Sequence, residues 1–209
     1  MIPILWQDEH LLVVDKPAGM LVVEAPGRSG RTLVTMVGAQ LGAKVHAVHR
    51  LDEDTTGVLV LAKTLPAKQA LEQIFREHAI ERLYLALVSR APTPPAGRIE
   101  SRLTEGPDGV VRSTRQGGEW AVTHYKTLAR AGRHTLVECR LETGRRNQIR
   151  AHLSELGSPI VGDRKYGWRG AGGERVGRLR LHAHSLRFTH PLTGEEVVVS
   201  AKTPEWVPA

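Results

Sequence analysis

The segment Val58–Ala62 is apolar at every position, and no other stretch constrains the fold as strongly. Successive side chains of a strand point to opposite faces, so a strand here needs cover on both faces and should be central in a sheet. It follows directly on a polar, turn-forming stretch, His49–Gly57. Loops carried by rigid strands often hold functional residues, which makes this junction the first candidate for a site.

The remaining pattern predicts an α+β fold with a mostly antiparallel sheet. A chain of 209 residues can bury one substantial core, and we expect a single domain over 1–209. Residues 91–118, rich in Pro, Gly and charge, should form a long loop or mobile hairpin with at most short strands, such as 98–103, and 170–173 a flexible surface loop. Further strands are expected over 2–6, 11–14, 20–23, 80–88, 122–129, 134–141, 179–188 and 196–200. Helices are expected over 32–41, 64–75 and 145–156, with Thr32 and Thr64 as caps and Gly42 and Gly157 as stops.

The chain carries a formal net charge of +7, and much of it lies in residues 143–180, which hold nine basic and three acidic residues. Clustered positive charge is typical of proteins that bind a phosphate backbone, but it also occurs as a solvated basic surface. Charge alone does not separate these two interpretations. The basic residues are Arg145, Arg146, Arg150, Arg164, Lys165, Arg169, Arg175, Arg178 and Arg180.

The single cysteine, Cys139, excludes an internal disulfide. The N-terminal residues lack the charged and apolar regions of a secretory signal, and no apolar run has the length of a membrane span. We therefore expect a cytoplasmic protein that does not bind a membrane and is a monomer.

Charged motifs recur in order along the chain: DKPAG at 15–19, HRLDEDTTG at 49–57, ERLY at 81–84 and LETGRRNQIRAHL at 141–153. Shorter matches follow: GD at 162–163, YG at 166–167, LHA at 181–183 and FTHP at 188–191. Together they resemble the RluA family of pseudouridine synthases, which isomerise uridine in RNA. The resemblance covers roughly residues 4–205. It implies a mixed, mostly antiparallel sheet with flanking helices and a central active-site cleft, and structured ribosomal or transfer RNA as the partner.

Asp52 is the candidate nucleophile. The isomerisation breaks an N-glycosidic bond and rejoins the base through carbon without a redox change, so no cofactor is expected. A carboxylate can attack the sugar, attack the base or remove a proton, and the sequence does not choose among these routes. Because Asp is common in turns, a structural turn residue is the alternative.

Arg150 and Tyr84 are the expected partners of Asp52. Arg150 borders the apolar stripe of its helix, where an arginine can be half-buried, and pairing would keep Asp52 ionised; the family's matching arginine is held to do this. Arg150→Ala is therefore expected to lose activity and to stay folded. The resemblance places the Tyr84 ring against a flipped uracil. The alternatives are a surface arginine and a core tyrosine.

Several other residues are expected to contact RNA. Arg50 would hold the flipped-out state, since extruding a base costs about a few kcal/mol, although an ion pair with Glu53 or Asp54 is the alternative. The segment 98–116, with Arg112 and Arg115, could clamp RNA and become ordered on binding. The remaining expected contacts are His49, Arg145, Gln148, Lys16, Arg164 and Lys165.

Two features depart from the usual family pattern. Asn147 stands where the family usually has His; Asn keeps hydrogen-bonding capacity but cannot become cationic, so we expect a change near the site or in an RNA contact and not a loss of chemistry. The matched core begins almost at the first residue. No accessory N-terminal RNA-binding domain is therefore expected, which favours a short stem-loop substrate.

Competing interpretations have less support. Ten histidines suggest a metal, and His182 and His184 share one face of a strand, but there is no Cys pair or His-Glu helical motif, so no metal is expected. Asp52 and Asp54 lie too close in sequence for a typical glycosidase pair. Residues 143–145 lack the Walker spacing of a phosphate loop. The main rival is a non-catalytic RNA-binding or ribosome-assembly protein, which the basic segment fits equally well.

Overall fold

The computed structural model describes residues 1–27, 30–170, 174 and 176–208. The chain divides into two compact units: the first comprises Met1–Arg82 and Ala183–Lys202, and the second comprises Leu83–His182 and Thr203–Ala209. Residues 171–173 of the expected surface loop, and the basic residue Arg175, lie outside the described residues. No helix within the described ranges combines the length and apolarity that crossing a membrane requires.

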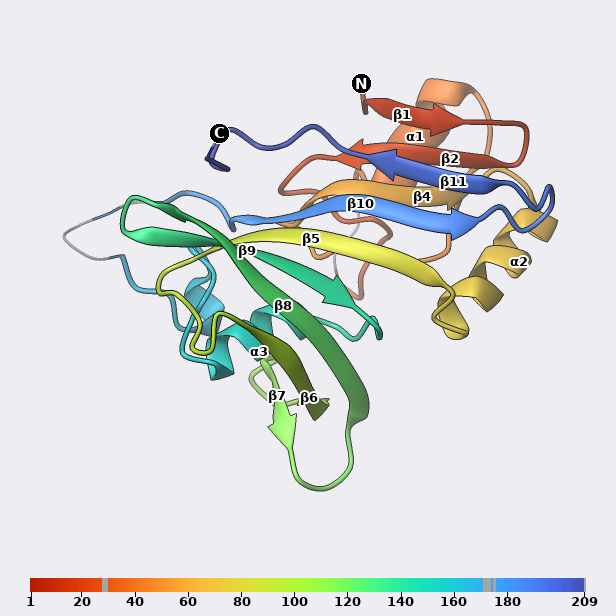
Figure 1. The fold of residues 1–209 in the computed structure, drawn as a ribbon. Helices are drawn as coiled ribbons and strands as arrows, with labels where there is room; N and C mark the ends of the chain where they lie inside the picture. Colours follow the sequence, from red (N-terminus) through yellow and green to blue (C-terminus); the bar gives the residue numbers. More distant parts are fainter. Residues whose placement is uncertain (28–29, 171–173, 175, 209) are drawn as a thin grey trace. The chain divides into compact units, whose positions relative to one another are not determined.

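The first unit is built on strands in the order β1–β2–β4–β10, with β11 beside β10 and β3 beside β4 (Figure 1). Residues Gly57–Ala62 of β4 are all buried, which confirms that the apolar run needs cover on both faces. The strands are β1 (Ile4–Gln7), β2 (Leu11–Lys16), β3 (His46–Ala47), β4 (Thr56–Ala62), β10 (Leu181–Thr189) and β11 (Glu196–Ser200).

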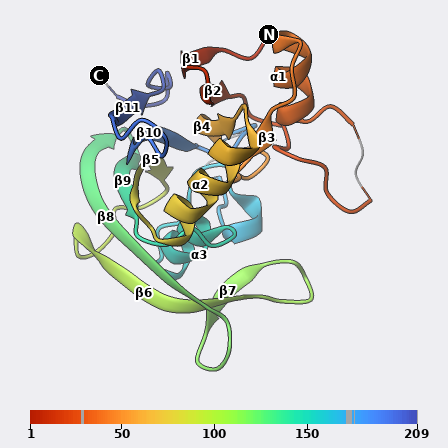
Figure 2. The same ribbon diagram turned by 90° about the vertical axis from the view of Figure 1, so that its right-hand side faces the viewer.

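Two helices of the first unit begin where their capping residues predict. Helix α1 (Leu33–Leu41) starts after Thr32, whose hydroxyl accepts from the N–H of Thr35 at 3.2 Å, and ends at Gly42 in the left-handed conformation. Helix α2 (Leu65–Arg76) starts after Thr64. It lies against β4 (Figure 2). Its Ala67 and Leu71 pack into an apolar core with residues of β2, β4, β10 and β11.

The strand expected over residues 20–23 is wrong. The carbonyls of Leu21 and Val22 accept hydrogen bonds from the N–H groups of Leu33 at 2.8 Å and Val34 at 3.2 Å. The first N–H groups of a helix have no partner within the helix. The carbonyls of this apolar segment therefore accept hydrogen bonds from the start of α1 and do not pair with a strand.

The second unit contains an antiparallel sheet in the order β5–β9–β8–β6–β7 (Figure 1). Helix α3 (Gln148–Glu155) packs Ala151 against Leu103, Val111 and Ala121 of this sheet. A short 3-10 helix, η1 (Arg164–Tyr166), follows. The strands are β5 (Ile80–Val88), β6 (Ala96–Glu105), β7 (Val111–Thr114), β8 (Glu119–Ala131) and β9 (His134–Leu141). With mostly antiparallel strands and three α-helices in the described residues, the expected fold class is confirmed.

Of the two alternatives expected over residues 91–118, a hairpin forms, because β6 pairs antiparallel with β7; β6 covers the expected short strand 98–103 and is longer than predicted. Strand β6 pairs with β8 from Ala96↔Lys126 to Leu103↔Glu119 and also pairs with β7. Only Leu103 of β6 is buried, so the alternating apolar pattern that marks a strand is missing from this segment. Strand β6 forms because its backbone pairs with that of β8, and no pattern in the sequence of β6 indicates this pairing.

Helix α3 begins three residues later than predicted, at Gln148 instead of Arg145. Asn147 takes a left-handed backbone conformation with φ +52°, which a right-handed helix cannot include. Residues 145–148 therefore form a turn, in which the N–H of Gln148 donates to the carbonyl of Arg145 at 3.2 Å.

We predict that Gly57→Ala lowers the free energy of unfolding by about 2–4 kcal/mol. A Cβ at this position would lie 2.0 Å from the Ala183 carbonyl oxygen, and φ is +108°. Gly194→Ala is the matched control, since it also has a positive φ, +77°, but nothing lies within 4 Å of its added Cβ. Urea denaturation of both variants measures the difference, and equal losses of stability would contradict the role of this contact.

Candidate active site

The loop between β3 and β4 carries Asp52 and is fastened to the turn after β2. The N–H groups of Gly19 and Met20 donate to the carbonyl of Glu53 at 3.0 and 3.2 Å, and the N–H of Thr55 donates to the carbonyl of Asp52 at 3.1 Å. The Asp52 side chain is half-buried. Its role as the nucleophile stays a prediction.

Lys16 is fully buried beneath this loop. Its ammonium donates to the carbonyls of Glu53 at 2.7 Å and Pro17 at 2.9 Å. Burial lowers the pKa of Lys16 to about 8, and the negative charges of Asp54, Asp52 and Glu53 oppose that shift. The expected phosphate contact of Lys16 is therefore wrong. Its side chain does not reach the surface, and its charge acts on the acidic loop instead.

His49 ties the start of the same loop to β4. Its Nε2 accepts from the N–H of Val60 at 3.1 Å, and its ring stacks on Phe75 with centroids 4.4 Å apart. The guanidinium of Arg82 lies over the Phe75 ring at 5.9 Å. Burial, and secondarily the Arg82 charge, lowers the pKa of His49 to about 3, so the ring is neutral at pH 7. The RNA contact expected of His49 stays a prediction, as does that of the exposed Arg50 next to it.

In the second unit, Arg150 is held by groups that the motifs alone did not assign. Its Nε and Nη2 donate to the two carboxylate oxygens of Asp163 at 2.7 and 2.9 Å, and its Nη1 donates to Oδ1 of Asn147 at 2.9 Å. The guanidinium carbon lies 4.8 Å from the centre of the Tyr166 ring. The Arg150 side chain is 15% exposed and that of Asp163 1% exposed, so the expected half-buried position is confirmed.

Asp163 is the residue whose role sequence reasoning missed. It also accepts from the N–H of Tyr166 at 3.3 Å and so fixes the start of η1. The sequence did offer one signal: Asp163 is one of only three acidic residues in the basic stretch 143–180. A buried carboxylate needs a cationic or hydrogen-bonding partner, and a lone acid among arginines is a natural candidate for such a pair.

Gln148 holds the turn that precedes α3. Its Oε1 accepts from Thr143 Oγ1 at 2.8 Å and from the Arg145 N–H at 2.9 Å. Its Nε2 donates to the Val122 carbonyl at 3.0 Å and to Thr123 Oγ1 at 2.9 Å. These four bonds use the hydrogen-bonding capacity of the amide, and the residue is 2% exposed. The RNA contact expected of Gln148 is therefore wrong, and its role is structural.

His152 extends the same buried network toward β6. Its Nδ1 lies 2.9 Å from Thr123 Oγ1 and its Nε2 lies 3.0 Å from Ser101 Oγ. The residue has no exposed surface. Burial lowers the pKa of His152 to about 4, and the Glu155 charge opposes the shift. Helix α3 is thus attached to β6 and β8 by hydrogen bonds made within one turn of Arg150.

Tyr84 lies on β5 opposite Cys139 of β9 and is 8% exposed. Its neighbours Leu85 and Leu87 are buried as well, at 6% each, so both faces of β5 are covered here. The strand is confirmed with the predicted bounds. The stacking role of the ring stays a prediction.

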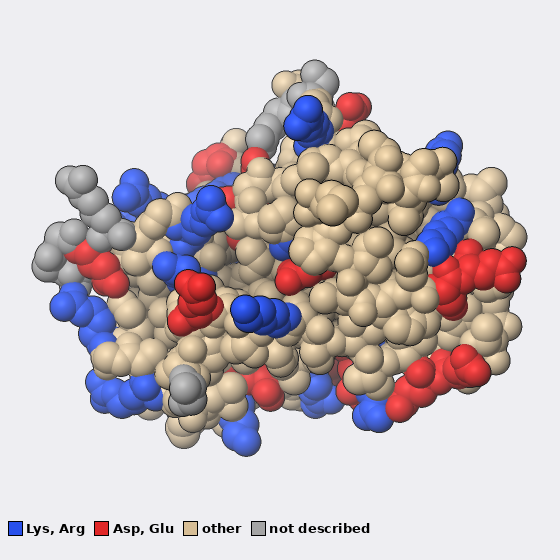
Figure 3. Space-filling model, turned by 90° about the horizontal axis from the view of Figure 1, so that it is seen from above, with Lys and Arg blue, Asp and Glu red and all other residues tan. Residues whose placement is uncertain are grey.

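The basic surface of the second unit is partly neutralised. Arg145 pairs with Glu119 at 2.7 Å, and Arg146 pairs with Glu105. Arg164 and Lys165 are exposed on η1, so their expected phosphate contacts stay predictions. Figure 3 shows Lys and Arg interspersed with Asp and Glu on the face it draws. Among the described side chains, no three His, Cys, Asp or Glu residues gather in a group that could hold a metal.

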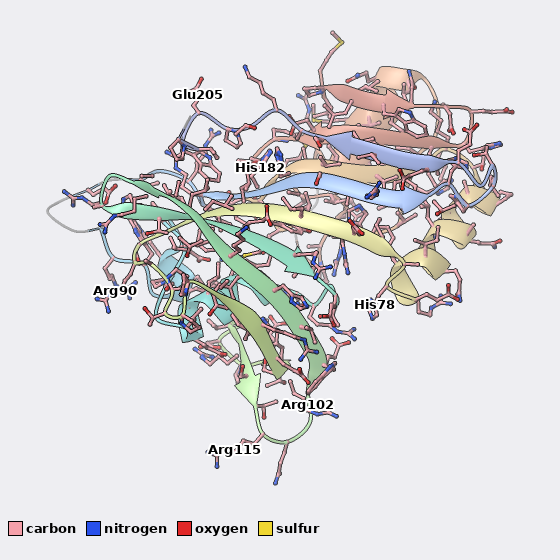
Figure 4. The ribbon with its side chains drawn as sticks, viewed as in Figure 1. His78, Arg90, Arg102, Arg115, His182 and Glu205 are labelled. Atoms are coloured by element: carbon pink, nitrogen blue, oxygen red, sulfur yellow. The ribbon has the colours of Figure 1, made fainter. Side chains whose placement is uncertain are left out.

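The strands β6 and β8 present an exposed aromatic residue among arginines. Trp120 is 44% exposed, and the Arg102 guanidinium lies 5.8 Å from its ring centre. Arg102 and Arg115 both lie near the same end of the strands β6, β7 and β8 (Figure 4). An exposed aromatic ring next to a cation is the combination that stacks on nucleic-acid bases.

Comparison with known proteins identifies what the chain is similar to. A family model described as RNA pseudouridylate synthase matches residues 10–155. Two relatives named ribosomal large subunit pseudouridine synthase D, from Xanthomonas campestris and Zymomonas mobilis, are 42% and 38% identical. Each alignment covers 97% of this chain but only 66% and 69% of the relative, so the chain spans about two thirds of their length.

Solved structures give the same fold. The human protein RNA pseudouridylate synthase domain containing 4 is 28% identical with a TM-score of 0.77, over 98% of this chain and 89% of that one. The human protein RNA pseudouridylate synthase domain containing 1 is 27% identical with a TM-score of 0.81, over 98% and 84%.

We predict that Arg150→Ala lowers the free energy of unfolding by about 3 kcal/mol, because it strands the buried Asp163 carboxylate. This adds a stability cost to the sequence expectation, which was that the variant loses activity and stays folded. Adding Asp163→Asn should recover at least about 1 kcal/mol, since the amide carries no charge and still accepts a hydrogen bond. Urea denaturation measures both variants, and a double variant less stable than Arg150→Ala alone would refute the pairing.

We also predict a pH-dependent contribution of His152 to stability. The unfolded histidine takes up a proton near pH 6.5, whereas the folded one resists protonation down to about pH 4. Folding is therefore weakened by up to about 1.4 kcal/mol per pH unit below pH 6.5. The stability difference between wild type and His152→Gln should shrink as urea denaturation moves from pH 7 to pH 5. A constant difference would show that His152 titrates normally in the folded state.

Proposed function

Since the chain belongs to the RNA pseudouridylate synthase family, we propose that it isomerises uridine to pseudouridine in RNA. The observation that carries this proposal is the Asp52 loop. Lys16 and the turn at Gly19 hold its backbone at Glu53, and the turn at Thr55 uses the Asp52 carbonyl. A carboxylate carried on a loop that is held in this way is suited to act as a nucleophile.

We assign three roles in the reaction. Asp52 acts as the nucleophile or base that starts the exchange; the N1–C1′ bond breaks, the C5–C1′ bond forms, N1 gains a proton and C5 loses one. Arg150 pairs with the Asp52 carboxylate and orients it. Tyr84 stacks on the extruded uracil. The order of the motifs along the chain, from 49–57 to 81–84 and 141–153, supports these assignments.

Ribosomal RNA is the substrate that we propose, because the relatives from Xanthomonas campestris and Zymomonas mobilis are named for the large ribosomal subunit. Arg50, Arg164, Lys165 and the Arg102–Trp120 pair are the exposed groups that would contact it. We further propose that both compact units belong to one catalytic domain over 1–209, because the family match at 10–155 continues across their boundary after Arg82.

We predict that the purified protein forms pseudouridine in ribosomal RNA extracted from cells and that Asp52→Ala forms none. Asp52→Asn should also be inactive, because an amide is neither a nucleophile nor a base here. Carbodiimide labelling followed by primer extension maps each product at single-nucleotide resolution. Tyr84→Phe serves as the matched variant that keeps the ring and removes the hydroxyl.

The outcomes separate the proposal from its rival. Product from the wild type but not from the Asp52 variants supports catalysis by this carboxylate. Product from all of them would remove Asp52 from the reaction. Equal RNA binding by all variants with no product from any would favour the non-catalytic RNA-binding protein. Transfer RNA, assayed in parallel, tests the choice of ribosomal RNA.

A further inference from the structure

Asn147 has an unusual position at the start of α3. It is one of two described non-glycine residues with positive φ; the other is His78. Asn at the N-cap of a helix normally takes an extended backbone and accepts from an N–H of the first turn with its side chain. Here the backbone is left-handed and the side chain makes no capping bond. Observed strain of this kind, with a forgone cap, points to a different use for the side chain.

That use is visible in the contacts of the amide. Oδ1 accepts from Arg150 Nη1 at 2.9 Å. The Tyr166 ring, whose centre lies 4.8 Å from the guanidinium carbon, is held separately, because its hydroxyl oxygen accepts from the Val111 N–H at 2.9 Å. Asn147 is 7% exposed, so its bond to Arg150 lies mostly away from water and is correspondingly strong.

The backbone of the turn is held by other groups. The Gln148 amide bonds to the Arg145 N–H, Thr143, Thr123 and the Val122 carbonyl, and the N–H of Ala151 donates to the Asn147 carbonyl at 2.9 Å. The Asn147 side chain is in none of these bonds. The turn should therefore persist without it, which separates positioning of Arg150 from folding of the loop.

We propose that Asn147 is a positioning residue for Arg150. Asp163 holds Nε and Nη2 of the guanidinium, Asn147 holds Nη1, and the Tyr166 ring lies against the guanidinium face. The bonds to Asp163 and Asn147 thus engage Nε, Nη2 and Nη1, so the guanidinium plane is held in one orientation. The inference rests on the proposed function, in which Arg150 orients the Asp52 carboxylate.

We predict that N147G reduces kcat by between about tenfold and a hundredfold and leaves KM for RNA unchanged, because a slightly misplaced guanidinium affects the reaction more than binding. Glycine tolerates positive φ and the Gln148 bonds still hold the turn, so the variant should fold, with stability lowered only by loss of the one hydrogen bond to Arg150. N147D retains an acceptor oxygen and tolerates the same backbone, and should recover most of kcat.

A second measurement does not depend on activity. In the 15N spectrum of the whole protein, Arg150 should show two separate Nη signals that exchange slowly, because Nη1 and Nη2 have different partners; Arg150→Lys identifies them. N147G should speed this rotation by about tenfold, as expected for loss of one hydrogen bond to a charged donor, while N147D should not.

These readouts distinguish the two proposals. If the wild type forms no pseudouridine, the proposed function fails, and the Nη rotation still decides the role of Asn147. If the wild type is active and N147G matches it in both kcat and rotation, the positioning role is overturned. Equal losses of kcat in N147G and N147D, with equally slow rotation in both, would also overturn it, because the acceptor would then not matter.

Discussion

The ion pair between Arg150 and Asp163 is the interaction around which residues 143–166 are organised. It joins α3 to η1 through two hydrogen bonds of 2.7 and 2.9 Å in a nearly dry environment. A buried pair of this kind adds little net stability compared with apolar packing, but it is costly to break. Its main effect is therefore one of orientation. The contacts of the guanidinium with Asn147 and Tyr166 depend on that direction being set.

Each unit uses a cation to hold a loop together, and for Lys16 the sequence had suggested surface charge instead. Lys16 lies beneath the acidic loop of the first unit, and Arg150 lies between α3 and η1 in the second. Each is satisfied by oxygen atoms, carbonyls for Lys16 and a carboxylate for Arg150. Positive charge on this chain thus serves two purposes. Some of it organises the loops that carry the motifs, and the exposed remainder, such as Arg50 and Arg164, is left for a polyanion.

Most of the elements could be predicted because their signals are local. Thr32 and Thr64 mark helix starts by capping, and the unbroken apolar run after Gly57 marks a covered strand. The misses have non-local causes. Strand β6 forms through pairing with β8, and residues 20–23 serve the N–H groups of α1. Likewise the motifs identified Asp52, Tyr84 and Arg150 as candidates, but burial of Lys16 and Gln148 and the partnership with Asp163 depend on tertiary contacts that one sequence does not display.

The close approach of β4 and β10 limits how this chain can change over evolutionary time. At Gly57 the obstacle to a side chain is the main-chain carbonyl of Ala183, which every amino acid carries. Replacing residue 183 by a smaller one therefore makes no room, and no second-site suppressor of that simple type exists. The backbone of residue 183 therefore restricts residue 57 to glycine. Lineages that keep this strand contact should keep glycine there whatever RNA they act on.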